Sequence, residues 1–326
     1  KNVFEFGRAL TPGPDHAYQV PRARFDEILF ECARNAGAKT FEEMTATIVS
    51  CDDSGCVVTG RKDDGTHHRF EAGFLIDASG QERLERRTSS AAVFGHFTGV
   101  PRLPGAEAGN IRIHLTHPGW MWQIPLRDGR TSIGLVVPGD DLAKRDGSIE
   151  DFYRQRTIRN PAMASSLENA EMVGSLSTTG NFSYRTARSY APGVIRVGDA
   201  YGFIDPIFSS GIHLALEGAR DAAKAVLDIR RKPGRREKIL KSYDRRIRRR
   251  VGHISWFIYS IHDPAFREML LNPKDLFGVE RAVISLLAGD FRPDIRLRIR
   301  VVLFKVLRKV VEITTVEEKK EKSYAR

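Results

Sequence analysis

Cysteine is scarce in this chain of 326 residues, which holds only Cys32, Cys51 and Cys56. No two of them form a C-x-x-C pair, and no pair of histidines lies near a cysteine pair at the spacing of zinc ligands, so we expect no metal site. An odd number of cysteines in a chain of this size argues against a disulfide framework. The composition therefore predicts a protein of a reducing compartment, and we expect it in the cytoplasm.

Long hydrophobic runs are lacking as well. No apolar run reaches the roughly 18 residues that a membrane-spanning helix needs, and the first residues do not read as a secretory signal. Apolar residues make up 41% of the chain and charged residues 29%, which is typical of a globular protein and excludes a disordered one. The length suffices for one large domain or two smaller ones, each with its own core.

Acidic residues are sparse toward the C-terminus. Residues 230–326 hold 26 of the 52 Lys and Arg but only 12 of the 41 Asp and Glu. This part therefore carries the excess of positive charge that gives the chain its net charge of +11. The basic run from Arg230 to Arg250 could serve phosphates, an anionic carrier protein or a membrane surface, or form a solvated helix. No nucleic-acid recognition motif surrounds the run, so we expect no nucleic-acid partner.

The apolar periodicity predicts an α/β chain with α+β elements. It predicts an amphipathic helix over residues 22–37 and strands over 41–59 and 69–76 that flank a turn at 62–65. A second set of strands, which includes 111–115 and 131–136, would form another sheet. We expect the helices to gather in the C-terminal part, at 212–227 and beyond 229.

The most informative stretch follows a short apolar strand that ends at Val197. Gly198-Asp199-Ala200 lets another group approach the backbone closely, and Ser209-Ser210-Gly211 offers caps for the helix that follows. A helix that begins there would aim free N–H groups at an anion. By residue type alone, Ser209 or Ser210 could instead serve as an ordinary helix cap, without binding an anion.

Residues 119–125, read as G-W-M-W-Q-I-P, fit the signature G-W-x-W-x-I-P, and together with residues 196–215 they resemble the flavin-dependent halogenases, a branch of the FAD monooxygenase superfamily. The resemblance covers most of the chain. It implies a partial FAD-binding, Rossmann-like domain (1–90, resumed at 186–228), a substrate-domain sheet over the flavin (91–185) and a C-terminal helical region (229–326). Without the motif, Trp120 and Trp122 would be read as sheet-packing aromatics.

The resemblance also implies roles for particular residues. Asp199 would accept hydrogen bonds from the ribityl chain of FAD, and Ser210 with Gly211 would hold chloride or bromide. The other residues implied at the cofactor are Gln19, Arg22, Gly198, Pro206, Gly211 and Ile212, and those beside the substrate tunnel are Trp120, Trp122, Pro125 and Phe208. Lys1 lies near the family's catalytic lysine but off its spacing, so the catalytic residue is left open.

The implied reaction begins with FAD that a partner reductase has reduced. A flavin hydroperoxide would oxidise the halide to hypohalous acid, which then reaches the substrate. Tryptophan halogenases carry a glutamate where this chain has Phe208, so the resemblance favours an electron-rich phenol or pyrrole, free or tethered to a carrier protein. An aromatic hydroxylase, a geranylgeranyl-reductase-like enzyme and a non-catalytic binding module remain alternatives.

Two features near the ends of the chain complete the sequence analysis. The chain contains no G-x-G-x-x-G turn, with which FAD enzymes of this kind open, so we expect an N-terminal truncation and weakened flavin binding. Near the C-terminus an apolar stripe lies among basic residues. We expect it to pack against the protein, with membrane or carrier-protein contact as the alternatives; the stripe consists of Ile299, Leu303, Val306, Val310 and Ile313.

Overall fold

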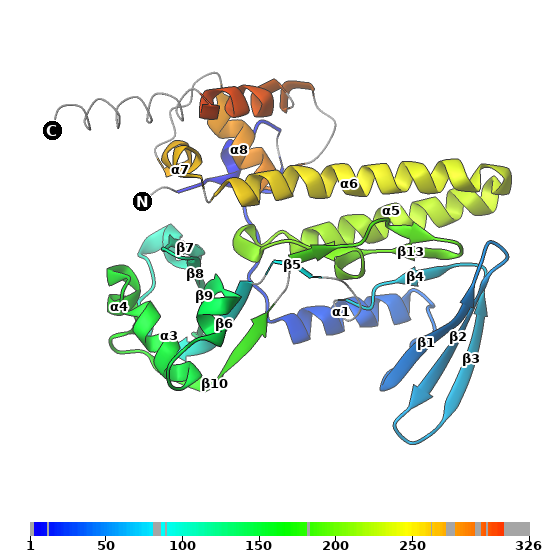
Figure 1. Cartoon of the computed structure of the whole chain (residues 1–326), viewed down its shortest axis with the longest axis horizontal. Coiled ribbons are helices and arrows are strands. Elements are labelled where there is room, and N and C mark those ends of the chain that lie inside the picture. The colour runs from blue at the N-terminus through cyan, green and yellow to red at the C-terminus, as the bar shows by residue number, and fades with distance from the viewer. Residues whose placement is uncertain are drawn as a thin grey trace. The chain divides into compact units, whose positions relative to one another are not determined.

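A computed structural model describes residues 3–11, 13–80, 86–88, 90–180, 183–261, 263–271, 278–290, 295–297 and 299–309 (Figure 1). The chain forms two compact units. One unit, called unit 1 below, consists of residues 1–17, 208–217 and 244–326, and unit 2 consists of 18–207 and 218–243. These boundaries differ from the four sequential segments expected, because the chain passes between the units several times. Lys1, Val310 and Ile313 lie outside the described residues.

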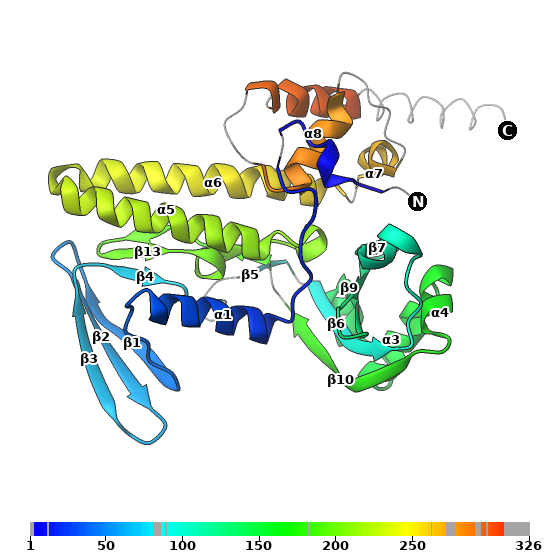
Figure 2. The same cartoon turned by 180° about the vertical axis from the view of Figure 1, so that it is seen from behind.

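Unit 2 begins with the predicted helix and hairpins. Helix α1 spans Arg22–Asn35, and Gly37 follows it with φ of 93°, a conformation that favours glycine after a helix end. Strands β1 (Met44–Cys51), β2 (Cys56–Lys62) and β3 (His67–Ala72) form an antiparallel sheet in the order β1-β2-β3. This sheet lies beside α1 in both views (Figures 1 and 2).

The hairpin of β1 and β2 joins Cys51 and Cys56 in a disulfide, since the two residues face each other across the strands. The expectation of no disulfide is therefore wrong for this pair. An odd count still leaves one cysteine over, and that cysteine is Cys32, which is exposed on α1. The sequence reasoning failed because it weighed the number of cysteines and not the short hairpin between two of them.

A small sheet holds the parallel strand pair of unit 2. Strand β13 (Val194–Arg196) lies between β12 (Tyr190–Ala191) and β4 (Leu75–Asp77), antiparallel to the first and parallel to the second. A further sheet contains β5 (Arg86–Thr88), β11 (Ser183–Arg185) and β14 (Gly202–Phe203), in the order β14-β11-β5. The carboxyl ends of β4 and β13 therefore lie at the same edge.

The largest described sheet lies within residues 90–180, where a substrate-domain sheet is expected. Its order is β10-β6-β9-β8-β7, and every pairing is antiparallel. The strands are β6 (Ser90–Thr98), β7 (Arg112–Leu115), β8 (Trp120–Pro125), β9 (Thr131–Pro138) and β10 (Glu171–Gly180). The turn η2 (Gly105–Gly109) precedes β7.

One face of this sheet packs against short helices to form a core. Helices α2 (Gly139–Ala143), α3 (Ile149–Thr157) and α4 (Pro161–Leu167) follow β9. Ser148 caps α3 by accepting the N–H of Asp151, and Asn160 caps α4 by accepting that of Met163. The buried members of the core are Val93, Phe97, Met121, Ile133, Leu135, Val137, Phe152, Tyr153 and Met163.

Two long helices belong to both units. Helix α5 spans Gly211–Arg231 and α6 spans Arg236–Ser260, with the turn η5 (Pro233–Arg235) between them. Their parts in unit 2 run side by side in both views (Figures 1 and 2). Many cations of the basic run are paired, among them Arg236 with Asp53 and Arg248 with Asp244.

Unit 1 also contains α7 (Pro264–Leu271), α8 (Val279–Leu287), the turn η1 (Phe6–Arg8) and helical residues 295–297 and 299–309, which we call the terminal helix. Leu297 and Phe304 are its buried side chains, whereas Ile299 and Val306 are exposed. The expectation that the stripe packs against the protein is therefore wrong for Ile299 and Val306, because the opposite face packs there, whereas Leu303 of the same stripe is half-buried. No described helix is long and apolar enough to cross a membrane.

Candidate functional site

The turn after β13 is the centre of the candidate cofactor site. β13 and β4 pair in parallel from Val194 to Arg196, and the N–H of Val197 extends the pairing by donating to the carbonyl of Asp77. The chain then turns through η3 (Gly198–Ala200), where Gly198 has φ of 54°. Ligands of open α/β sheets bind beyond the carboxyl ends of such strands.

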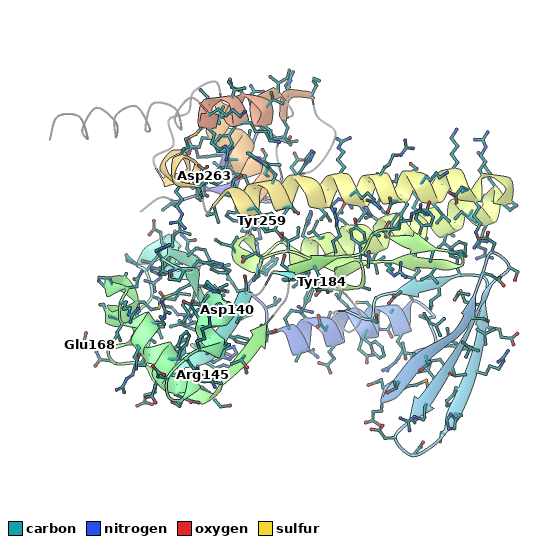
Figure 3. All side chains as sticks on the ribbon, in the orientation of Figure 1. Asp140, Arg145, Glu168, Tyr184, Tyr259 and Asp263 are labelled. Carbon is teal, nitrogen blue, oxygen red and sulfur yellow. A yellow bond between two sulfur atoms is a disulfide. The ribbon has the colours of Figure 1, made fainter. Side chains whose placement is uncertain are left out.

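Asp199 is held in this turn through its backbone. The hydroxyl of Tyr184 donates to the carbonyl oxygen of Asp199 at 2.7 Å (Tyr184 is labelled in Figure 3). Burial, and then the charge of Asp199, raise the pKa of Tyr184, so the phenol keeps its proton and remains a donor. The backbone on which the Asp199 carboxylate depends is thus fixed by a β11 side chain.

The other strand end has a similar turn. The Asp77 carboxylate accepts the N–H and the hydroxyl of Ser79 at 3.1 and 2.7 Å, and Gly80 follows with φ of 78°. A Cβ at Gly80 would meet no atom within 4 Å, so the backbone is open there. Two glycine-containing turns at adjacent parallel strand ends, each with an aspartate, fit the ribose and ribityl side of a dinucleotide cofactor such as FAD.

The sheet and the segment after η3 meet at Asp205. The indole N–H of Trp120 donates to Asp205 Oδ2 at 3.5 Å, while Asp205 Oδ1 accepts the N–H of Ile207 at 3.0 Å. The second bond holds the start of η4 (Pro206–Phe208). Trp120 is buried and Asp205 is half-buried, so the link is partly shielded from water. The structure thus joins two predicted motifs, G-W-x-W-x-I-P and the segment that begins at Asp205.

Trp120 and Trp122 lie on the same face of β8, with their ring centroids 5.7 Å apart. The Trp122 ring covers Gly134 of the neighbouring β9, where a Cβ would come within 2.1 Å of the indole. Its N–H donates to the Ser132 hydroxyl at 3.1 Å. These contacts make one face of the sheet aromatic, while the opposite face carries the core.

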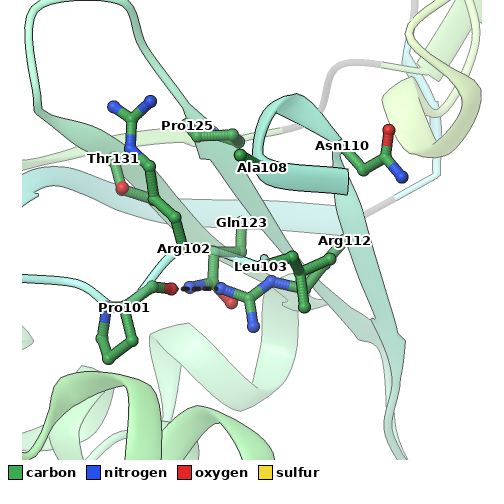
Figure 4. Close-up of a pocket in the computed structure, with 9 residues that line it drawn as sticks. All are labelled: Pro101, Arg102, Leu103, Ala108, Asn110, Arg112, Gln123, Pro125 and Thr131. Carbon is green, nitrogen blue, oxygen red and sulfur yellow. Dashed lines mark hydrogen bonds between the residues drawn. The ribbon is translucent and has the colours of Figure 1, made fainter. Parts of the chain in front are cut away.

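Pro125 does not share that face. It pairs with Thr131 and lines a small hollow with Gln123, Arg102 and Arg112 on the opposite side of the strand (Figure 4). Arg112 donates to the carbonyl of Pro101 at 3.0 Å. Because side chains alternate along a strand, the fifth residue after Trp120 points away from it. The structure therefore separates Pro125 from the two tryptophans with which the resemblance grouped it.

Gln123 is a polar residue that the sequence reasoning missed. Its side chain is 1% exposed, and neither amide atom meets hydrogen-bond geometry with a described residue. The hollow beside it has about 10 Å³ of free space, enough for about one water molecule. A glutamine in the middle of a strand of apolar residues was the signal that could have found it.

The predicted halide residues lie in unit 1, at the start of α5. The carbonyl of Ser210 accepts the N–H of Leu214 at 3.0 Å, so the helix begins at Gly211 and Ser210 precedes its first turn. Ser209 has φ of 52°, a left-handed conformation that is uncommon for a residue other than glycine. Ile212 lies in the first turn and Phe208 packs against Phe257, with ring centroids 5.0 Å apart.

Gln19 and Arg22 make local contacts. Gln19 donates to the carbonyl of Gly109 at 3.0 Å, and Arg22 pairs with Asp26 within α1. None of the contacts described for these two side chains joins them to Asp199. Within the part of the chain that the structure describes, no three His, Cys, Asp or Glu side chains gather as metal ligands do.

The family model described as Tryptophan halogenase matches residues 6–97 and 111–268. Flavin-dependent halogenase armH3 of Armillaria mellea is 33% identical over 249 residues, which are 66% of this chain and 49% of that protein. A chlorinase of Pseudomonas fluorescens, named for 1H-pyrrole-2-carbonyl bound to a peptidyl-carrier protein, is 28% identical over 231 residues, 66% of this chain and 51% of the chlorinase.

Among solved structures, the myxobacterial chondrochloren halogenase CndH, described as a variant of FAD-dependent halogenases, superimposes with a TM-score of 0.72 at 29% identity. The superposition covers 87% of this chain and 71% of CndH. The chain spans about half the length of the two curated relatives above.

Proposed function

The chain belongs to the tryptophan halogenase family of flavin-dependent enzymes, and from that premise we propose that the protein halogenates an electron-rich aromatic substrate with chloride or bromide. The observation that carries the proposal is the bond from Trp120 to Asp205. It ties the G-W-x-W-x-I-P motif, which carries the resemblance to halogenases, to the segment that leads to Ser210.

The family's cofactor is FAD, which, when bound and reduced by a partner reductase, supplies the chemistry that activates oxygen. In our proposal Asp199 accepts hydrogen bonds from the ribityl chain, and Gly198 and Pro206 allow close approach to the flavin. The N–H groups at Ser210 and Gly211, with the Ser210 hydroxyl, bind the halide, because a helix N-terminus favours an anion. Gln19, Arg22, Gly211 and Ile212 complete the predicted cofactor contacts.

Phe208 supports the choice of substrate. An aromatic side chain packed on Phe257 cannot take up a proton from the substrate ring. The substrate must therefore be activated already, as phenols and pyrroles are, and the similarity to a carrier-protein chlorinase supports a tethered form alongside a free one. Trp120 and Trp122 would exclude the substrate from the flavin side.

Mass spectrometry of the products tests the proposal. The whole protein, including any residues that flank this sequence, is given reduced FAD, a flavin reductase, oxygen, bromide and a panel of phenols, pyrroles and indoles. We expect a product with the two-line isotope pattern of bromine, absent when bromide is replaced by fluoride. A product that gains only oxygen would point to a hydroxylase, and no product from any substrate would favour a non-catalytic binding module.

Flavin binding tests the role of Asp199 separately from turnover. Asp199→Asn keeps the size of the side chain but removes the charge that would accept ribityl hydroxyls, so we expect flavin affinity to fall about 10-fold, as for loss of one charge-assisted hydrogen bond. Asp228→Asn is the matched control, because Asp228 pairs with Lys224 on the surface of α5. Equal affinities of the two variants in a fluorescence titration would contradict the assignment.

A further inference from the structure

The terminal helix has two apolar faces, and one of them is exposed. Leu297 and Phe304 are buried, at 5% and 4% exposure. Four aliphatic side chains at helical spacing lie on the other side and are more than half exposed: Ile295 at 65%, Ile299 at 60%, Val302 at 59% and Val306 at 52%. At 100° per residue these four occupy a single stripe along the helix, which we call the outer stripe.

The buried face holds the helix in this orientation. Phe304 packs edge-on against Phe266 and Trp256, with ring centroids 5.4 and 6.1 Å away. Arg308 pairs with Asp263 at 3.2 Å (Asp263 is labelled in Figure 3), and the ammonium of Lys305 lies 4.3 Å from the centre of the Trp256 ring. Rolling the helix to bury the outer stripe would break these contacts, so the stripe stays on the surface of unit 1.

The charged residues within the terminal helix all have one sign. Residues 295–309 contain six Lys and Arg and no Asp or Glu. On the helical wheel, Lys305 and Lys309 lie along one side of the stripe and Arg296 along the other, and all three are exposed. An aliphatic ridge between rows of cations complements a surface that is apolar inside and anionic outside.

We propose that the terminal helix docks on an anionic membrane surface, with the outer stripe at the acyl boundary and the cations among the lipid headgroups. An interfacial helix has this pattern, whereas a specific protein interface buries about 800 Å² on each partner and is enriched in aromatic anchors. The outer stripe is one residue wide and wholly aliphatic. At about 1.5 Å per residue, the described residues of this helix extend over less than the roughly 30 Å of a bilayer's hydrocarbon core, so in this proposal the helix lies in the plane of the membrane.

Vesicle flotation of the 326-residue chain tests this proposal without any need for enzymatic activity. We expect binding to vesicles of phosphatidylcholine with 30% phosphatidylglycerol, weaker binding to pure phosphatidylcholine, and weaker binding at 500 mM than at 50 mM NaCl. The double variant Ile299→Gln/Val302→Gln should bind at least 10-fold more weakly. The control Ile158→Gln/Val173→Gln changes aliphatic side chains that are exposed elsewhere, at 57% and 40%.

Three results would overturn the proposal. Equal binding by the two double variants would mean that another surface meets the lipid. No binding by the original chain, with circular dichroism of a folded protein, would remove the proposal altogether. A dimer in light scattering that the Ile299→Gln/Val302→Gln variant alone dissociates would assign the outer stripe to a second copy of the chain.

Discussion

At the scale of single residues, Gly134 shows how a residue without a side chain positions one with a large side chain. A Cβ there would lie between 2.1 and 2.4 Å from three atoms of the Trp122 ring. The indole ring is rigid and its N–H donates to the Ser132 hydroxyl, so the ring cannot easily move aside. The orientation of Trp122 on the aromatic face therefore depends on the glycine across the strand.

Gly134→Ala should force the Trp122 ring away from β9 and lower the free energy of unfolding by about 1–3 kcal/mol, as overpacking does. Urea denaturation measures the stability, and tryptophan fluorescence reports the move of the ring. Gly180→Ala in β10 is the control, because the nearest atoms to its Cβ would be 4.0 Å away. Equal stability of the two variants would contradict this account.

His114 is a half-buried ionisable group on the core face of β7. Burial, and then the charge of Arg112, lower the pKa of His114 from 6.5, while the adjacent Gln123 offsets part of the effect. As the pH falls, the unfolded chain takes up this proton before the folded chain does. The stability that neutral His114 contributes is therefore complete above about pH 6.5 and is lost below it.

His114→Gln should consequently reduce the loss of stability between pH 7.5 and pH 5.5. Urea denaturation at the two pH values measures it, with His67→Gln as the control because His67 is exposed on β3. If both variants lose as much stability as the original chain over this range, His114 does not cause the pH dependence.

At the scale of elements, the sequence predicts where the strands lie better than it predicts which strands pair with one another. Apolar periodicity and Gly37 locate α1 within two residues, and the predicted turn at 62–65 separates β2 from β3. The order β10-β6-β9-β8-β7 has no local signal, because it depends on pairings between residues far apart in the chain. The same holds for the candidate site: its motifs are visible in the sequence, but the contact between Trp120 and Asp205 is not.

Through that contact, β8 helps to hold Asp205 and with it the start of η4. Trp120→Phe removes the indole donor, so Asp205 loses one of the bonds that hold it and the Ile207 amide should exchange its hydrogen faster. We expect a stability loss of about 1 kcal/mol. In Trp122→Phe the lost bond is to Ser132 within the sheet, so hydrogen exchange over residues 202–207 should stay unchanged. Similar exchange in the two variants would argue against this link.

At the scale of the whole molecule, α5 and α6 are continuous across the boundary between the units. Residues 211–217 of α5 belong to unit 1 and 218–231 to unit 2, and α6 is divided at Asp244. The sequence predicts the body of α5, but the division of a helix between units depends on tertiary packing. A helix cannot unfold in one unit without losing turns that support it in the other.

The two units should therefore unfold together, in a single thermal transition. The three tryptophans allow a direct test, since Trp120 and Trp122 report on unit 2 and Trp256 on unit 1. We expect Trp256→Phe and the double variant Trp120→Phe/Trp122→Phe each to show the same midpoint by fluorescence as by far-ultraviolet circular dichroism. Midpoints that differ between the two methods within either variant would show that the units unfold independently.

The parallel pairing of β4 with β13 also sets an order of events during synthesis. Leu75 pairs with Val194, and the whole five-stranded sheet lies in the chain between them. A ribosome must therefore release more than a hundred further residues before β4 meets its neighbour. Among the described strands, those of the intervening sheet pair only with one another, so this sheet is free to fold first. The nascent protein then acquires its aromatic face before it acquires the strand edge that carries Asp199.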